Sequence, residues 1–243
     1  MKYEFATLRK SYKPARNWWN TFVLQPVMLP TLWFVANFTR LRPNTISFIS
    51  FILYLLCGFF FTSGNLILGA IFFELGVLGD AIDGKLARLK YKPTKFGAYT
   101  DTWVDTWGHF IAAITLGVGM FVNTGNHWWL LMGGIMFFVK IQHSIEALMT
   151  SNLISPDKYK RVVVGIGAKK EQKGFLISVR KFLLKRRLRD PLSGSDVKNL
   201  LFFVAPLFGI VSIMLMIIIP LFLLKAIFWF FYYRNILKKL DDE

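Results

Sequence analysis

The chain has 243 residues, and 54% of them are apolar, which exceeds the ~45–50% that is usual in soluble domains. Its formal net charge of +16 arises from 30 Lys and Arg residues against 14 Asp and Glu, a balance that suits nucleic acid or an anionic membrane surface. Because the apolar residues gather in long runs, the composition favours a membrane protein and argues against nucleic acid as a partner. Cys57 is the only cysteine, so no disulfide can form within the chain.

The N-terminal segment, residues 1–45, is predicted to be cytoplasmic and interfacial. It does not resemble a cleaved signal peptide, because Pro26 and Pro30 break its apolar run and no small-residue cleavage site follows. Tryptophan and phenylalanine residues are mixed there with prolines and basic residues. This mixture predicts an N-terminal interfacial helix or elbow that lies in the headgroup layer of the membrane.

Six membrane-spanning helices are predicted over residues 46–236, which makes the fold an all-α integral membrane protein. Each predicted span is close to the ~20 apolar residues that cross a bilayer. The spans are Ile46–Thr62, Leu66–Asp83, Ala98–Val122, Trp128–Thr150, Leu200–Met216 and Ile218–Ile236. The last two are divided near Ile217–Leu221, because Pro220 disfavours a continuous helix there. Residues 237–243 are predicted to be a C-terminal tail.

The distribution of basic residues predicts how the spans are oriented. The numbers of Lys and Arg are seven in residues 1–44, five in 84–96, twelve in 153–197 and three from Arg234 onward. The short connections 63–65 and 123–127 carry none. Because basic segments stay on the cytoplasmic side, this alternation predicts an even number of spans with both termini in the cytoplasm.

The long basic connection, residues 153–197, contains a segment that mixes apolar and basic residues at roughly helical spacing. This segment is Phe175–Leu188. It has two readings: attachment to anionic lipid on the cytoplasmic side, or a lid over the active site.

Four aspartates lie within 26 residues of one another, from Asp80 to Asp105. On a helix Asp80 and Asp83 share a face, and Asp101 and Asp105 share a face of the next helix. The basic stretch between them contains Pro93 and suits a cytoplasmic turn. Two antiparallel helices are therefore predicted to direct two carboxylates each toward one point near the cytoplasmic surface.

These carboxylates predict a metal site. An ionised Asp at the centre of a membrane helix costs about 2.5–3.5 kcal/mol on insertion scales, and four close carboxylates also repel one another. Hard divalent cations suit clustered carboxylate oxygens, and four such ligands match a two-metal site for phosphoryl transfer. The alternative is a set of structural ion pairs with the neighbouring Lys and Arg residues.

The aspartate segment resembles the signature of the CDP-alcohol phosphotransferase (CDP-alcohol phosphatidyltransferase) family. The shared pattern is D-x2-D-G-x2-A-R-x8-G-x3-D-x3-D, whose fixed positions are Asp80, Asp83, Gly84, Ala87, Arg88, Gly97, Asp101 and Asp105. The stretch Leu41–Ser47 also resembles the Pro-Asn sequence with which the family begins its first span. The resemblance implies six spans, an active site that faces the cytoplasm and a homodimer.

The resemblance also implies a reaction. In this family an acceptor alcohol attacks the β-phosphorus of a CDP-alcohol, and CMP is released. The expected function is therefore that of a membrane transferase of phospholipid biosynthesis with CDP-diacylglycerol as its donor. Two Mg²⁺ or Mn²⁺ ions are expected, bound by Asp80, Asp83, Asp101 and Asp105, and Asp105 is also the expected general base.

Four further motif residues are expected, by the same resemblance, to bind the CDP part of the donor. Gly84 and Ala87 would give the nucleotide and its pyrophosphate close access to the helix. Arg88 would hold phosphate with its planar guanidinium group. Gly97 would let two helices, or a helix and the nucleotide, approach closely.

Other ionisable residues within the predicted spans have more than one possible interpretation. Lys140, His143 and Glu146 fall within an arc of about 120° on the fourth span, so they either pair to stabilise packing or form a wall of the acceptor pocket. Glu74 is expected to make a contact between helices. His109, one turn after the last aspartate, is either a partner of that aspartate or an ordinary packed histidine.

Three alternatives concern the function. The same chemistry would serve a soluble donor such as CDP-inositol, CDP-choline or CDP-ethanolamine with a lipid or polyol acceptor. An aspartate-rich prenyltransferase places its two carboxylate motifs far apart in sequence, unlike this chain. A divalent-cation transporter needs polar residues along a complete path, whereas these carboxylates gather at one side.

Overall fold

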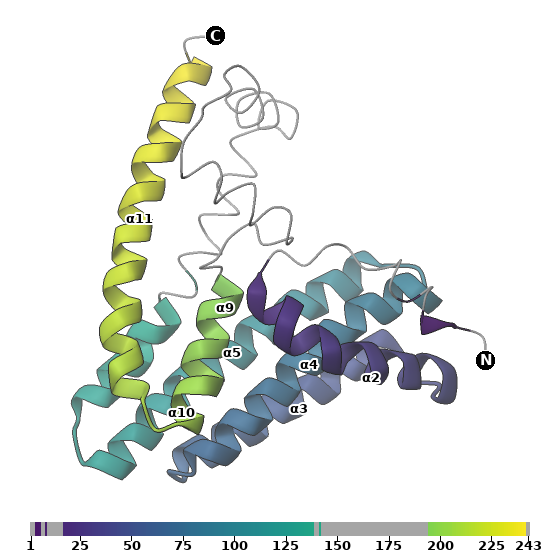
Figure 1. The fold of residues 1–243 in the computed structure, drawn as a ribbon, viewed down its shortest axis with the longest axis horizontal. Coiled ribbons are helices and arrows are strands. Elements are labelled where there is room, and N and C mark those ends of the chain that lie inside the picture. The colour runs from purple at the N-terminus through teal and green to yellow at the C-terminus, as the bar shows by residue number, and fades with distance from the viewer. Residues whose placement is uncertain (1–2, 6–7, 9–16, 139–140, 142–193, 242–243) are drawn as a thin grey trace.

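The computed structural model describes residues 3–5, 8, 17–138, 141 and 194–241, and every regular element in these ranges is a helix (Figure 1). The first half contains a π-helix at Asn20–Leu24, α2 (Gln25–Phe38), α3 (Pro43–Thr62), α4 (Leu66–Lys90), α5 (Lys95–Thr124) and a helix at Trp128–Phe138. The last part contains α9 (Gly194–Asn199), a π-helix at Leu200–Val204, α10 (Ala205–Leu207) and α11 (Val211–Asp241). The predicted all-helical class is confirmed for these residues.

Helix α3 lies at the centre of the first bundle and packs along both α4 and α5. Tyr54 of α3 is fully buried between two glycines, Gly76 of α4 and Gly108 of α5. A Cβ atom on these glycines would lie 2.8 Å and 2.2 Å from the Tyr54 ring. Small residues at such contacts let helix backbones approach closely, which is the usual way that helices pack in membranes.

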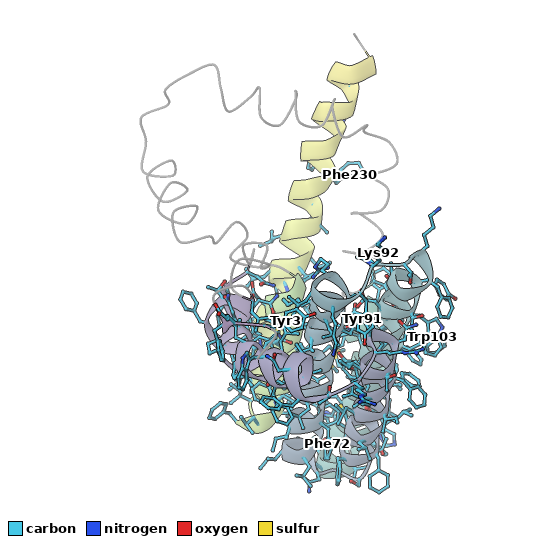
Figure 2. All side chains as sticks on the ribbon, turned by 90° about the vertical axis from the view of Figure 1, so that its right-hand side faces the viewer. Tyr3, Phe72, Tyr91, Lys92, Trp103 and Phe230 are labelled. Carbon is cyan, nitrogen blue, oxygen red and sulfur yellow. The ribbon has the colours of Figure 1, made fainter. Side chains whose placement is uncertain are left out.

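Within the described residues, three helical stretches are long and apolar enough to cross a membrane. They are Asn20–Phe38, Pro43–Thr62 and Lys95–Thr124, and the shorter apolar helices are Trp128–Phe138 and Val211–Leu224. Many of their large apolar side chains face outward, as Trp103 does in Figure 2. These features agree with a membrane protein. The count of six spans and the cytoplasmic placement of both termini remain predictions.

The predicted boundary between the last two spans is wrong. Helix α11 continues through Pro220, and the chain turns instead at Gly209, which has a φ of +68°. A proline removes only one backbone donor from a helix, and membrane helices accommodate this. At Gly209 the left-handed backbone lets Ile210 N donate to Ala205 O at 2.9 Å, which ends the preceding helix with its carbonyls satisfied.

Helix α2 continues the π-helix without a break and crosses α4 (Figure 1). Its buried Leu32 and Ala36 join Ile82 and Leu86 of α4 in one apolar cluster. The side chain of Lys90, at the end of α4, donates to the main-chain oxygens of Ala36 and of Thr39, at 3.3 and 3.1 Å. The end of α2 is thereby attached to the end of α4 that leads into the aspartate turn. The interfacial position of α2 remains a prediction.

Candidate active site

The turn between α4 and α5 brings the ends of these helices together. Helix α4 ends at Lys90, where Tyr91 adopts an extended backbone, and α5 begins at Lys95 after Pro93. The Thr94 side chain accepts a hydrogen bond from Gly97 N at 3.0 Å and so caps the first turn of α5. The turn predicted around Pro93 is confirmed, and it places the two aspartate-bearing helices side by side.

Three of the four aspartates converge. Asp80, Asp83 and Asp101 each offer a carboxylate oxygen, and these oxygens lie within 4.8 Å of one another. Among the described residues, Asp80 Oδ1 and Asp83 Oδ1 are buried and have no hydrogen-bond partner. Buried carboxylate oxygens need a positive or donating partner, and a hard divalent cation provides one. The three side chains therefore fit a divalent metal.

Asp105, the fourth predicted ligand, is not a member of this group of three. Its Oδ1 lies 3.3 Å from Lys198 Nζ, on α9, and 3.3 Å from His109 Nδ1. The structure therefore brings together three predicted ligands and pairs the fourth with a lysine. The role of Asp105 as a metal ligand and base remains a prediction.

The sequence left two interpretations of His109 open, a partner of the last aspartate or an ordinary packed histidine, and the structure shows features of both. Its side chain is fully buried, and its ring packs against Tyr54 and Phe73, with ring centroids 6.0 and 5.8 Å away. Its Nδ1 also approaches the main-chain oxygen of Asp105, one turn earlier. His109 is thus a packed histidine that contacts the last aspartate.

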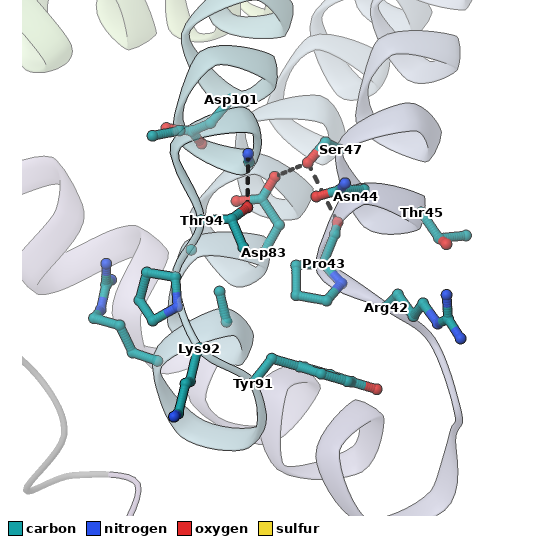
Figure 3. A pocket seen from close by; sticks show the side chains of 16 residues that line it. Arg42, Pro43, Asn44, Thr45, Ser47, Asp83, Tyr91, Lys92, Thr94 and Asp101 are labelled. Atoms are coloured by element: carbon teal, nitrogen blue, oxygen red, sulfur yellow. Dashed lines mark hydrogen bonds between the residues drawn. The ribbon is translucent and has the colours of Figure 1, made fainter.

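Two residues of the site were missed as individual candidates. Ser47 of α3 donates a hydrogen bond to Asp83 Oδ2 (Figure 3). It lies within the Leu41–Ser47 stretch, whose resemblance to the family was noted without a role for Ser47 itself. Lys198 stands at the start of an apolar run, beside Asp196 and Asn199. This short group of polar residues at the edge of a predicted span was the only feature of the sequence that could have pointed to Lys198.

A cavity of about 770 Å³ opens beside the three aspartates (Figure 3). Its lining includes Asp83 and Asp101 and all four predicted CDP-binding residues, which are Gly84, Ala87, Arg88 and Gly97. Arg42 and Lys92 add two further positive charges to its wall. A basic cavity next to clustered carboxylates can hold a phosphorylated ligand together with a cation.

Gly84 faces this cavity with no side chain of its own. Among the described residues, a Cβ atom there would find only the Arg88 guanidinium within 4 Å, at 3.7 Å. The helix surface beside Asp83 is therefore open to a ligand. The predicted role of Gly84, close approach of the nucleotide, remains a proposal that this opening supports.

Lys85 lies just past the predicted second span, Leu66–Asp83. Burial, together with the positive charge of Arg88, lowers the pKa of its ammonium to about 8, while the charges of Asp80 and Asp83 oppose this shift. Its Nζ donates to Ala81 O of the same helix at 2.8 Å. The side chain thus runs back along α4.

Two other predictions concern residues within the spans. Trp19 Nε1 donates to Glu74 Oε1 at 2.9 Å, so the expected contact of Glu74 between helices is confirmed. Lys140, His143 and Glu146, predicted for the acceptor pocket, lie outside the described residues.

Comparisons with known proteins identify one matching family model and several local relatives. The family model described as CDP-alcohol phosphatidyltransferase matches residues 40–237. An uncharacterized protein of Aquifex aeolicus is 41% identical over 79 residues, which are 32% of this chain and 40% of that protein. An archaetidylinositol phosphate synthase of Pyrococcus horikoshii is 35% identical over 80 residues, 33% of this chain and 42% of the synthase.

A bifunctional IPC transferase and DIPP synthase of Rubrobacter xylanophilus is 34% identical over 83 residues, 33% of this chain and 19% of that protein. The chain thus spans less than half the length of these curated relatives. The similarity to each of them is local, whereas the family match covers most of the chain.

Proposed function

Because the chain belongs to the CDP-alcohol phosphatidyltransferase family, we propose that it is a membrane transferase that moves a substituted phosphate from a CDP-alcohol to an acceptor hydroxyl and releases CMP. One observation carries this proposal. The carboxylates of Asp83 and Asp101 line the same cavity as Arg88 and Gly84, so metal-binding and phosphate-binding groups face one space.

The donor's pyrophosphate is proposed to lie in this cavity. Arg88, with Arg42 and Lys92, supplies positive charge for phosphate oxygens, and Gly84 leaves room for the nucleotide against α4. Mg²⁺ or Mn²⁺, held by the aspartates, would supply neutralisation of the pyrophosphate charge. Ser47 orients Asp83 by its hydrogen bond to Oδ2.

Asp105 is proposed to be the general base. In the transfer, a bond forms between the acceptor oxygen and the β-phosphorus, and the bond from that phosphorus to the oxygen of CMP breaks. The proton of the acceptor hydroxyl passes to the Asp105 carboxylate. CMP leaves with the electron pair of the broken bond.

A lipid donor of the CDP-diacylglycerol type is proposed, with a phosphorylated polyol as the acceptor. The name of the Pyrococcus horikoshii relative, archaetidylinositol phosphate synthase, supports an inositol phosphate acceptor. The helices that are apolar enough to cross a membrane support a donor that resides in the bilayer.

The test is CMP release by purified protein in detergent with Mg²⁺ or Mn²⁺. The donors are CDP-diacylglycerol and CDP-choline, and the acceptors are inositol phosphate, glycerol 3-phosphate, serine and diacylglycerol. We expect release with CDP-diacylglycerol and an anionic acceptor, and loss of release in Asp105→Asn. Absence of CMP from every pairing would contradict the proposal, and metal flux into liposomes without CMP release would favour the transporter reading.

A further inference from the structure

Lys198 brings a positive charge to the aspartates from the far end of the described chain. Its Nζ lies 3.3 Å from Asp105 Oδ1, although 93 residues separate them in sequence. The side chain of Lys198 is 13% exposed and that of Asp105 is 33% exposed. The ammonium is thus largely buried and the carboxylate partly exposed, so the pair is less screened by water than a fully exposed surface pair.

This lysine does not belong to the donor cavity. Every residue that lines the cavity, in the part of the chain that the structure describes, falls between Arg42 and Asp101. Lys198 comes instead from α9, and its contact is with the one motif aspartate outside the group of three. Lys198 and Asp105 therefore form an ion pair beside the group of three aspartates, and neither residue belongs to the lining of the cavity.

The backbone around Lys198 is anchored on both sides. Asp196 is fully buried, and its Oδ1 accepts a hydrogen bond from Trp19 N at 2.9 Å. Trp19 in turn donates from Nε1 to Glu74 of α4. Val197 and Leu201 are buried in the main apolar core. These contacts connect α9 to the start of the π-helix Asn20–Leu24 and to α4, so buried contacts hold the backbone from which the lysine reaches Asp105.

We propose that Lys198 is a positioning residue for Asp105, an inference that rests on the proposed function. Three carboxylates gather in one group, and their charge repels a fourth. The Lys198 ammonium offsets this repulsion and holds the Asp105 carboxylate in a single orientation, ready to accept the proton of the acceptor hydroxyl. Lys198 itself contacts neither the donor nor the reacting atoms.

The experiment combines Lys198→Met, Lys198→Arg, Asp105→Asn and the double variant Lys198→Met/Asp105→Asn, assayed by CMP release from CDP-diacylglycerol with inositol phosphate. Lys198→Met should lower kcat about tenfold or more. General-base catalysis contributes a rate enhancement of ~10²–10⁴-fold, and a misplaced base loses part of it. The KM for CDP-diacylglycerol should change less than about twofold, because the cavity keeps its lining. Lys198→Arg should recover part of kcat.

The double variant separates positioning from an independent role. If Lys198 acts through Asp105, the double variant should be no slower than Asp105→Asn alone, since coupled residues are not additive. Multiplied losses would overturn the proposal. An unchanged kcat in Lys198→Met would also overturn it, as would a rise confined to the KM for inositol phosphate, which would make Lys198 a ligand of the acceptor.

Two controls keep the outcome interpretable. Lys238→Met removes an exposed lysine of α11 and should leave kcat unchanged. Thermal unfolding in detergent checks that each variant is folded, and Lys198→Gln, which keeps a hydrogen-bond donor, replaces Lys198→Met if the latter unfolds. A wild-type protein that releases no CMP overturns the proposed function and this inference together. If the wild type is active and Lys198→Met has the same kcat, this inference alone is overturned.

Discussion

The hydroxyl of Ser47, on α3, donates a hydrogen bond to Asp83 Oδ2, on α4. The other carboxylate oxygen of Asp83, Oδ1, is buried and has no hydrogen-bond partner among the described residues. One oxygen is thus oriented by a neighbouring helix, and the other is left for a cation. A partner that orients a metal ligand in this way is typical of protein metal sites.

Ser47→Ala is therefore expected to weaken metal binding. The loss of an orienting partner costs about 10–100-fold in metal affinity in comparable sites. The Mn²⁺ concentration for half-maximal CMP release should rise by about tenfold or more. Ser50→Ala is the matched control, because Ser50 is also buried on α3 but donates to Ile46 O of its own helix at 3.0 Å. Equal effects of the two changes would contradict the assigned role of Ser47.

Removal of the divalent metal should lower the thermal stability of the wild type. A ligand that binds only the folded protein stabilises it by about 2.7 kcal/mol at 100 times its Kd. Thermal unfolding in Mg²⁺ or Mn²⁺ should therefore occur at a higher temperature than in EDTA. In Asp83→Asn this difference should shrink or vanish. In Glu4→Gln, which alters an exposed carboxylate, it should persist. A wild type indifferent to EDTA would argue against the metal site.

Gly84→Leu should impair donor binding without unfolding the protein. Among the described residues, a Cβ at this position meets only the Arg88 guanidinium, so the helix tolerates it, but a leucine side chain projects into the cavity. The KM for CDP-diacylglycerol should rise by about tenfold or more, in the manner of lost substrate binding. Thermal unfolding should stay close to that of the wild type, because helices favour leucine over glycine. An unchanged KM would mean that the nucleotide lies elsewhere.

Gly108→Ala should destabilise the bundle. Its new Cβ would lie 2.2 Å from the buried Tyr54 ring, and overpacking of this kind costs about 1–3 kcal/mol. Gly134→Ala, within the helix Trp128–Phe138, is the matched control, because a Cβ there has no atom of the described residues within 4 Å. It should be neutral or stabilising by up to about 1 kcal/mol. Unfolding by denaturant in detergent compares the two variants. An unchanged free energy of unfolding in Gly108→Ala would show that α3 and α5 can move apart.

Local spacing accounts for what could be predicted along the chain. Apolar runs mark α3, α4 and α5, and the helical period places Asp80 and Asp83 on one face. Pro93, in the turn after α4, separates the two aspartate-bearing helices. The same local reasoning failed at Pro220, because a proline within a long apolar helix costs one hydrogen bond, whereas the left-handed residue Gly209 reverses the chain.

The sequence by itself determined α3, α4 and α5, the family signature and the four aspartates that carry the proposed chemistry, since all of these depend on residues close together in the chain. Only the tertiary structure decided which carboxylates meet. It grouped Asp80 and Asp83 with Asp101 and paired Asp105 with Lys198. Those contacts depend on how separate helices pack, and packing is set by the whole core rather than by the spacing within any one segment.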